Sequence, residues 1–455
     1  MTYTRKKKTN YFLNIFIILG CFLFPFIFSC QSTPRDINKI TDTTDTTDTT
    51  ANKEQLYVEG TFIQEWLVSD WSDLQWQTEF SALKNVGIKY VILTTALHGD
   101  VNNNYTTIYP TSLAFAKQTT AVDVIEKCLF NAQMLGIKVF IGINFNDNWW
   151  KASTLPNSWL CDQMEKGNQV ANELYANYKS RYNDTLYGWY WIWEIDNLNW
   201  QSLVSQNLLI KAMNISLDYL NNLSPDMPVM LCPFVNSVYG TPEQNGDFWK
   251  YIFSKTNFKK EDIFAPQDCI GAGGIKIEDL AHWFKALRES VNSKPGLKFW
   301  SNAENFEPDF WAAAPLQRFI KQTQIVNPYV DKIISFSYTH YYSPNQKTAK
   351  FHKTYLEYFK TGILKENAPQ SISNLRVVKH DNQFILIWDE PSAKENVAGY
   401  YVYENNVLIG NFQYNAHEVC TTQLLINPVQ DGKKTYSVCS YNSVGTTSSP
   451  TCISY

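Results

Sequence analysis

The stretch of residues 188–200, Gly-Trp-Tyr-Trp-Ile-Trp-Glu-Ile-Asp-Asn-Leu-Asn-Trp, decides how the rest of the sequence is interpreted. Its first half is apolar and aromatic, which is typical of a strand buried on both faces. Its second half places Glu194 and Asp196 where such a strand would end. Because residues two apart on a strand point to the same side, both carboxyl groups are predicted to face one site. Alternatively, Asp196 begins the next helix as its N-cap.

Strand-like apolar runs alternate with helix-like segments over residues 56–362. Eight such units predict an α/β fold of the (β/α)8 TIM-barrel type. A doubly wound sheet would alternate in the same way, but no glycine-rich dinucleotide turn follows the first run. The predicted strands are 57–64, 89–95, 138–145, 186–195, 228–235, 263–270, 298–306 and 332–341, and the predicted helices are 76–86, 121–135, 163–182, 202–223, 243–255, 277–291, 315–326 and 346–360.

The predicted strands begin apolar and end polar. In a TIM barrel the C-terminal ends of the strands converge on the active site, so these ends predict a polar pocket. They carry Gln64, Glu65, Asn144, Asn146, Glu194, Asp196, Gln267, Asp268, Asn302, Glu304, Tyr338 and His340. His340 could donate to a ligand hydroxyl, hold Glu304, or be a satisfied barrel histidine. Four tryptophans in loops after strands could stack on sugar rings or fill the loop core: Trp66, Trp149, Trp150 and Trp200.

Several classes of protein are disfavoured by composition. The net charge is -4, and the four basic residues at positions 5–8 leave the remainder more acidic, which argues against a nucleic-acid partner. The six histidines have no metal-ligand spacing, no Cys-x-x-Cys pair occurs, and no Gly-x-Ser-x-Gly elbow is present. No metal or cofactor is therefore expected. The cysteines are dispersed, and Cys439 and Cys452 are the most plausible pair.

The N-terminus has the order of an export signal. A basic run at residues 5–8 precedes an apolar segment over 11–28 and then Cys30. Residues 1–30 resemble a bacterial lipoprotein signal, which implies that Cys30 carries the lipid; a transmembrane anchor is the alternative. The Thr/Asp-rich segment 31–55 is predicted to be a disordered stalk. Either anchor predicts an exported protein that is tethered to a membrane, with the outer membrane or cell surface favoured.

Residues 367–455 form short, alternating β-rich runs with turn residues between them. The runs 385–388, 399–403 and 436–442 resemble those of a fibronectin type III domain. The resemblance implies a small all-β sandwich after the barrel, with Trp388 in its core and Tyr436 at the tyrosine-corner position.

The barrel also resembles known families. Glu194 closes the fourth predicted strand and Glu304 the seventh, as do the acid/base and the nucleophile of the large clan of retaining (β/α)8 glycosidases. Trp193 stands where that clan usually has Asn. The segments 60–64, 193–200, 266–268 and 302–307 resemble a bacterial glycosidase-like barrel family that is largely a domain of unknown function. This likeness implies a pocket lined by Gln64, Glu194, Asp196, Gln267, Asp268, Asn302, Glu304 and Tyr338, whereas Glu307 is expected to pair outside it.

Two functions follow from these residues. The first is a retaining glycoside hydrolase that acts on an extracellular oligo- or polysaccharide, with Glu194 and Glu304 as the catalytic pair. The second is a glycan-binding surface lipoprotein without turnover. Both predict an aromatic and polar pocket, and they differ in whether the two carboxyl groups face each other across it.

Overall fold

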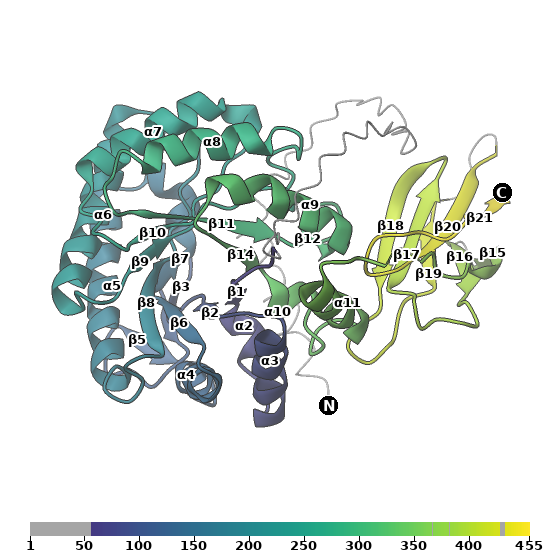
Figure 1. Ribbon diagram of the computed structural model, residues 1–455, viewed down its shortest axis with the longest axis horizontal. Coiled ribbons are helices and arrows are strands. Elements are labelled where there is room, and N and C mark those ends of the chain that lie inside the picture. Colours follow the sequence, from purple (N-terminus) through teal and green to yellow (C-terminus); the bar gives the residue numbers. More distant parts are fainter. Residues whose placement is uncertain (1–55, 366, 382, 428–432) are drawn as a thin grey trace, which may run out of the picture. The chain divides into compact units, whose positions relative to one another are not determined.

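The computed structural model describes residues 56–365, 367–381, 383–427 and 433–455. They contain a closed barrel of eight parallel strands surrounded by helices (Figure 1), which confirms the predicted TIM barrel. Around the barrel the strands are β1 (Gly60–Ile63), β14 (Lys332–Phe336), β11 (Lys298–Glu304), β10 (Ile263–Phe264), β9 (Val229–Leu231), β8 (Leu186–Trp191), β6 (Lys138–Gly142) and β2 (Tyr90–Leu93).

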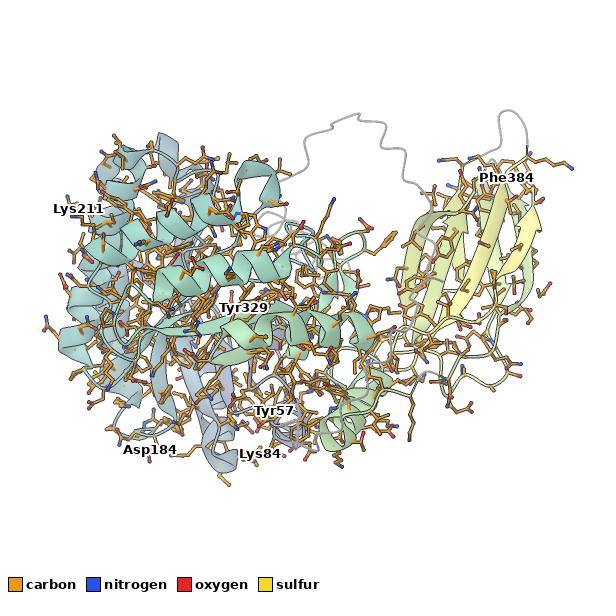
Figure 2. All side chains as sticks on the ribbon, turned by 45° about the horizontal axis from the view of Figure 1, so that its top comes forward. Tyr57, Lys84, Asp184, Lys211, Tyr329 and Phe384 are labelled. Atoms are coloured by element: carbon orange, nitrogen blue, oxygen red, sulfur yellow. The ribbon has the colours of Figure 1, made fainter. Side chains whose placement is uncertain are left out.

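One long helix follows each barrel strand, as the alternation predicts. Local signals fix the ends: Ser72 with Gln75 and Thr241 with Gln244 form capping boxes at the starts of α3 and α7. Charged side chains such as Lys84 and Lys211 point outward from the helical ring (Figure 2). The helices are α3 (Asp73–Asn85), α4 (Val124–Leu135), α5 (Asn157–Tyr178), α6 (Leu203–Leu223), α7 (Pro242–Lys255), α8 (Leu280–Val291), α9 (Leu316–Val326) and α11 (Ala349–Thr361).

The interior of the barrel is filled by aromatic side chains from strands that are not neighbours. Phe62 of β1 lies 5.4 Å from Tyr190 of β8, and Tyr90 of β2 lies 5.1 Å from Trp300 of β11, measured between ring centroids. Such layers make the barrel a packed core and not a channel. A ligand can therefore reach the strand ends only from the mouth of the barrel.

All eight predicted strands run past the observed C-terminal ends, and in two of them a predicted site residue lies in another element. The predicted strand 138–145 is divided, because β6 ends at Gly142 and Asn144 begins β7 of a separate four-stranded sheet. That sheet consists of β5 (Ala116–Gln118), β4 (Tyr105–Thr107), β3 (Leu97–Gly99) and β7 (Asn144–Asn146). The predicted strand 332–341 ends at Phe336, and Tyr338–Tyr341 form the short helix α10. Side-chain directions past both points therefore do not follow strand parity.

Short elements complete the barrel region. They are α2 (Glu65–Val68), β12 (Phe306–Glu307), β13 (Ala312–Ala313) and the 3-10 helices η1 (Asp147–Thr154), η2 (Ser237–Tyr239) and η3 (Asn327–Tyr329).

The C-terminal region is all-β. One sheet has the order β15 (Ser373–His380), β16 (Gln383–Asp389), β19 (Gln423–Ile426), and the other β18 (Val407–Gln413), β17 (Gly399–Glu404), β20 (Thr435–Tyr441), β21 (Thr451–Ser454). Every pairing within the two sheets is antiparallel. Trp388 is buried in the apolar core, as predicted, and Tyr436 is buried in the same core.

The membrane predictions concern residues that the structure does not describe, since Cys30 and the segment 31–55 lie outside the described ranges. Within those ranges no helix is long and apolar enough to cross a membrane. Cys439 and Cys452 are free thiols, so the suggested disulfide is not formed in the structure. Their register explains this, because Cys452 lies opposite Ser437 and not opposite Cys439.

Candidate active site

Glu194 lies three residues beyond the end of β8, at the mouth of the barrel. Its carboxyl Oε1 accepts a hydrogen bond of 3.1 Å from Gln267 Nε2, and its backbone oxygen accepts one of 2.9 Å from Trp149 Nε1. Burial raises the pKa of Glu194 to about 8, the Gln267 amide opposes the shift, and the charge of Asp196 adds to it. Glu194 is therefore a carboxylic acid at neutral pH and can donate a proton.

Glu304 is the last residue of β11 and is 1% exposed. Its Oε2 accepts a 2.6 Å hydrogen bond from the backbone N–H of Ala272, whereas its Oε1 is buried without a partner. Gly271 makes this approach possible, because a Cβ there would lie 2.7 Å from Glu304 Cβ and 3.0 Å from Oε2. The turn after β10 thus covers the carboxyl group.

Burial also raises the pKa of Glu304 to about 8, and the charge of Asp268 contributes next. The Ala272 N–H and the Arg318 guanidinium oppose the shift, while the charge of Glu194 adds to it. The charges of Glu304 and Glu194 both also raise the pKa of the buried Cys269 thiol. The two carboxyl groups therefore share one water-poor region, in which ionising either one disfavours ionising the other.

Asp268 holds this region together by means of both its oxygens. Oδ1 accepts from the N–H groups of Glu304 (3.1 Å) and Ile270 (3.2 Å), and Oδ2 accepts from Gln322 Nε2 at 2.6 Å. Gln322 also donates to the Glu304 carbonyl oxygen at 2.9 Å and accepts from Arg318. Both carboxylate oxygens of Asp268 accept hydrogen bonds from the protein. Asp268 therefore positions Glu304 and Gln322, and does not bind a ligand as predicted.

Asn302 and Gln267 lie beside the carboxyl pair, as the strand ends predict. The two residues form a parallel bridge between the segments of β10 and β11. Asn302 is two residues before Glu304, and its Oδ1 is likewise buried without a partner. Buried polar atoms are almost always hydrogen-bonded, so two orphaned oxygens on the same face of one strand mark a place where a ligand could supply the donors.

A second group of predicted residues gathers at the ends of β1 and β14. His340 Nδ1 lies 3.2 Å from Gln64 Oε1, and the Trp66 ring lies 5.6 Å from the imidazole. His340 also stacks on Tyr341 at 4.4 Å. Burial lowers the pKa of His340 to about 3, so its ring is neutral. His340 is hydrogen-bonded to Gln64 and not to Glu304, so the prediction that it holds Glu304 is wrong.

Three other predicted residues point elsewhere. Asn144 Nδ2 donates to the Gln163 carbonyl oxygen of α5 at 2.9 Å, because β7 turns it toward that helix. The Tyr338 hydroxyl bonds to His352 of α11, because Tyr338 lies on α10 and not on a strand. Asp196 accepts from the N–H groups of Leu198 and Asn199, so it caps its own turn.

The loop tryptophans divide between the two alternatives. Trp149 and Trp200 are 3% exposed and stack on each other at 5.1 Å, so they belong to the loop core. Trp66 and Trp150 are partly exposed. Glu307 accepts a 3.2 Å hydrogen bond from Arg318 Nε, so it forms an ion pair with α9. In the described part of the chain, no group of three or more His, Cys, Asp or Glu side chains is placed to hold a metal ion.

Sequence reasoning missed the residues that support Glu304 from a distance. Gln322 and Arg318 lie on the outer helix α9, where helical spacing alone reads as ordinary packing. The contact of the Ala272 N–H with Glu304 depends on how two strands lie side by side. Gln322 is buried on α9, but the burial of a helical glutamine is not visible in the sequence, so no local signal marks it as a partner of Glu304.

Replacing Asp268 with asparagine should destabilise this network. At pH 7.5 Asp268 is ionised, because burial raises its pKa only to about 6. The asparagine NH2 group would face the Gln322 NH2 group, and Gln322 cannot turn over without losing Arg318. We expect the free energy of unfolding to fall by about 1–3 kcal/mol in urea titrations. Gln322→Glu in the same chain should restore part of the loss; an unchanged single variant would contradict the network.

Comparison with known proteins defines the class first. A candidate alpha-L-fucosidase from Bacteroides thetaiotaomicron shares the fold at a TM-score of 0.57 and 21% identity, over 71% of this chain and 99% of that one. Two other structures are more distant. An endo-beta-1,4-mannanase from Thermotoga petrophila has 12% identity and a TM-score of 0.34, over 89% of this chain and 98% of that one. A beta-glucuronidase from Bacteroides uniformis has 10% identity and a TM-score of 0.40, over 89% of this chain and 46% of that one. Because both of these scores are below 0.5, neither bears on function. The protein is a TIM barrel of glycosidase-like fold.

A family model matches most of the barrel. Residues 58–348 match the family described as Domain of unknown function (DUF4434), and the chain belongs to it. No curated protein matches the chain.

Proposed function

We propose that this protein is a glycoside hydrolase that cleaves an extracellular glycan with retention of configuration. Glu194 is the general acid/base, and Glu304 is the nucleophile that forms a covalent glycosyl intermediate. The observation that carries the proposal is the placement of two buried, mutually repelling carboxyl groups at the ends of the fourth and seventh barrel strands. The fold shared with a candidate fucosidase is consistent with this reaction but does not name the sugar.

The chemistry follows from the charges. Both pKa values are raised to about 8, so the pair must lose one proton before it can react. In that form Glu194 keeps its proton and donates it to the departing glycosidic oxygen, while ionised Glu304 attacks the anomeric carbon. Glu194, now a carboxylate, then deprotonates the water that hydrolyses the glycosyl ester. The Ala272 N–H and Arg318 stabilise the ionised form of Glu304, and the orphaned Asn302 Oδ1 is available to a sugar hydroxyl beside the reacting carbon.

A glycan-binding protein without turnover is the second candidate, and the burial of Glu304 favours it. A nucleophile that is 1% exposed and covered by the turn at Gly271 reaches a sugar only if that turn moves. Incubating the full-length protein with a panel of oligo- and polysaccharides separates the two candidates. Products whose first-formed anomer has the substrate configuration support the hydrolase; inverted products contradict double displacement, and binding without products supports the second candidate.

We also propose that the protein is an exported lipoprotein held by Cys30, with the segment 31–55 as a spacer. The support is the order of basic run, apolar segment and cysteine in the sequence. Cys30→Ser should leave the precursor unprocessed or release the protein from the membrane fraction, as judged by its mass and by fractionation. Cys21→Ser, inside the apolar segment, is the matched control and should be processed normally. Unchanged processing and retention of Cys30→Ser would disprove the lipid anchor.

A further inference from the structure

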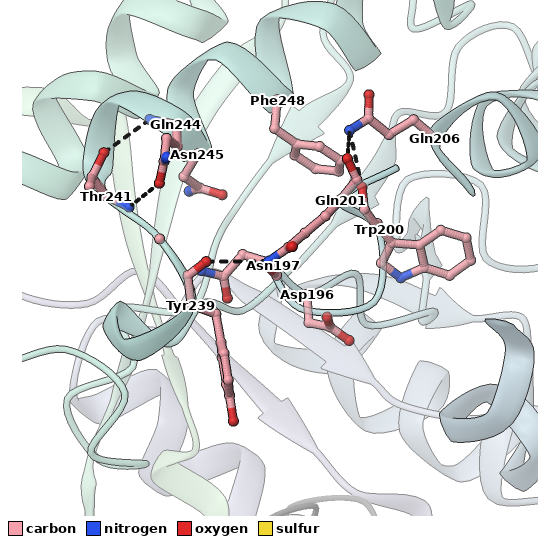
Figure 3. A pocket seen from close by; sticks show the side chains of 11 residues that line it. Asp196, Asn197, Trp200, Gln201, Gln206, Tyr239, Thr241, Gln244, Asn245 and Phe248 are labelled. Carbon is pink, nitrogen blue, oxygen red and sulfur yellow. Dashed lines mark hydrogen bonds between the residues drawn. The ribbon is translucent and has the colours of Figure 1, made fainter. Parts of the chain in front are cut away.

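A pocket of about 300 Å3 lies beside the loop that carries Glu194 (Figure 3). Asp196, two residues after Glu194, forms part of its wall, and the opposite wall comes from the first turns of α7. Its volume is at the lower limit of small-molecule sites in proteins. None of the polar groups described for Glu304 lines it, so the pocket is a separate compartment at the same end of the barrel.

The pocket is lined by an amide that has no hydrogen-bond partner among the described residues. Asn245, on α7, is 7% exposed and lines the pocket, yet its side chain makes no hydrogen bond with the described residues. Figure 3 shows its amide beside Phe248. The polar atoms of this amide are not sealed from solvent, so its two donors and its acceptor are open to the pocket. A ligand with hydroxyl groups would satisfy them.

Neighbouring amides are held in fixed orientations. Gln206 Nε2 donates to the carbonyl oxygens of Trp200 and Gln201 at 3.1 Å, and Gln201 Nε2 donates to that of Asn197 at 2.9 Å. The side-chain carbonyl oxygens of Gln201 and Gln206 therefore remain as acceptors for a ligand. Because the amides are already fixed, a ligand that meets this array loses little conformational entropy in the protein.

The charge and shape of the lining indicate the kind of ligand. No lysine or arginine lines the pocket, and its single charged side chain is the Asp196 carboxylate, which would repel an anionic sugar. The half-buried ring of Phe248 offers an apolar face for the C–H side of a pyranose. Amides that meet hydroxyl groups and an aromatic ring that meets a sugar face fit a neutral sugar.

We propose that the pocket around Asn245 is a subsite for a neutral sugar unit of an oligosaccharide that extends past Glu194. The proposal rests on the proposed function in that the bound unit belongs to the glycan cleaved at Glu194 and Glu304. It defines the substrate class as a neutral glycan of at least two units, because the pocket and the carboxyl pair are separate compartments.

Calorimetric titration of the full-length Glu304→Ala variant tests the subsite without consuming the probe. The probes are neutral gluco-, manno-, xylo- and galacto-oligosaccharides of one to six units, together with oligogalacturonates. At least one neutral series should bind, more tightly with length, and adding Asn245→Leu should weaken that binding about 10-fold. Asn222→Leu is the control. It removes an exposed amide near the C-terminal end of α6, whereas the pocket lies at the N-terminal end of that helix, so this variant should bind as before. Circular dichroism confirms folding, and Phe248→Ala is the second variant.

The outcomes separate this proposal from the hydrolase. Neutral binding that depends on Asn245, with no cleavage by the parent protein, supports the subsite and contradicts the hydrolase. Cleavage of a neutral oligosaccharide at an unchanged KM in both Asn245→Leu and Phe248→Ala overturns the subsite and leaves the hydrolase. Equal affinity for oligogalacturonates, or no binding of any neutral series, also overturns the subsite.

Discussion

Glu304→Ala is expected to lower kcat/KM for a cleaved glycan by about 10⁴-fold or more, because the covalent step has no other nucleophile. The shortened side chain leaves space under the Gly271 turn that azide can enter. Azide should then attack the anomeric carbon from the side that Glu304 occupied and restore turnover of an activated aryl glycoside. The product, a glycosyl azide of inverted configuration, is identified by NMR.

Glu307→Ala is the matched control for that experiment. Glu307 is three residues further along, forms an ion pair with Arg318, and has no contact with Glu194. It should retain turnover within a few-fold of the parent protein. If Glu304→Ala hydrolyses the substrate at the parent rate, or if azide yields no glycosyl azide while activity is lost, Glu304 is not the nucleophile.

Glu194→Ala is expected to slow substrates with poor leaving groups by about 10²–10⁴-fold, the usual contribution of a general acid. Aryl glycosides with acidic phenols need no protonation, so their first step should change little. Kinetics with a series of phenols of rising pKa measure this difference as a steeper dependence on the leaving group. A slope equal to that of the parent protein would exclude Glu194 as the acid.

The dependence of activity on pH is a second test of Glu194 as the general acid. Burial raises the pKa of Glu194 to about 8, so the acid is protonated at neutral pH and activity should fall as the pH rises above that value. Asp196→Asn removes a charge that raises this pKa, so the alkaline limb should move to lower pH. The limb is read from kcat/KM against pH for an oligosaccharide, and a shift to higher pH would contradict the electrostatic account.

The eight-fold alternation was predictable because the barrel strands are rich in apolar residues and the helices between them carry buried apolar residues at helical spacing. The placement of Glu194 and Glu304 followed from the same pattern, since both terminate such runs. Asn144 and Tyr338 were misplaced because the barrel strands end two residues before them, at Gly142 and Phe336. Nothing local in an apolar run distinguishes a strand that continues from one that enters a second sheet or a helical turn.

The remaining site features depend on contacts between distant segments. Asp268 stood at a predicted strand end, but its role was decided by Gln322, 54 residues away on α9. The unpartnered amide of Asn245 was equally invisible, because an Asn in the first turns of a helix is ordinary in sequence. Only the packing of α7 against the loop after Glu194 makes it part of a pocket.

The aromatic layers of Phe62, Tyr190, Tyr90 and Trp300 have a consequence for how a glycan can move. They seal the floor of the barrel, so a polysaccharide cannot be threaded through the protein and processed from one end to the other along the barrel axis. In the proposed hydrolase a glycan must lie across the rim with its two ends directed into solvent, and both fragments must depart through the opening by which the glycan arrived. Substrate entry and product release must therefore use the same opening at the mouth of the barrel.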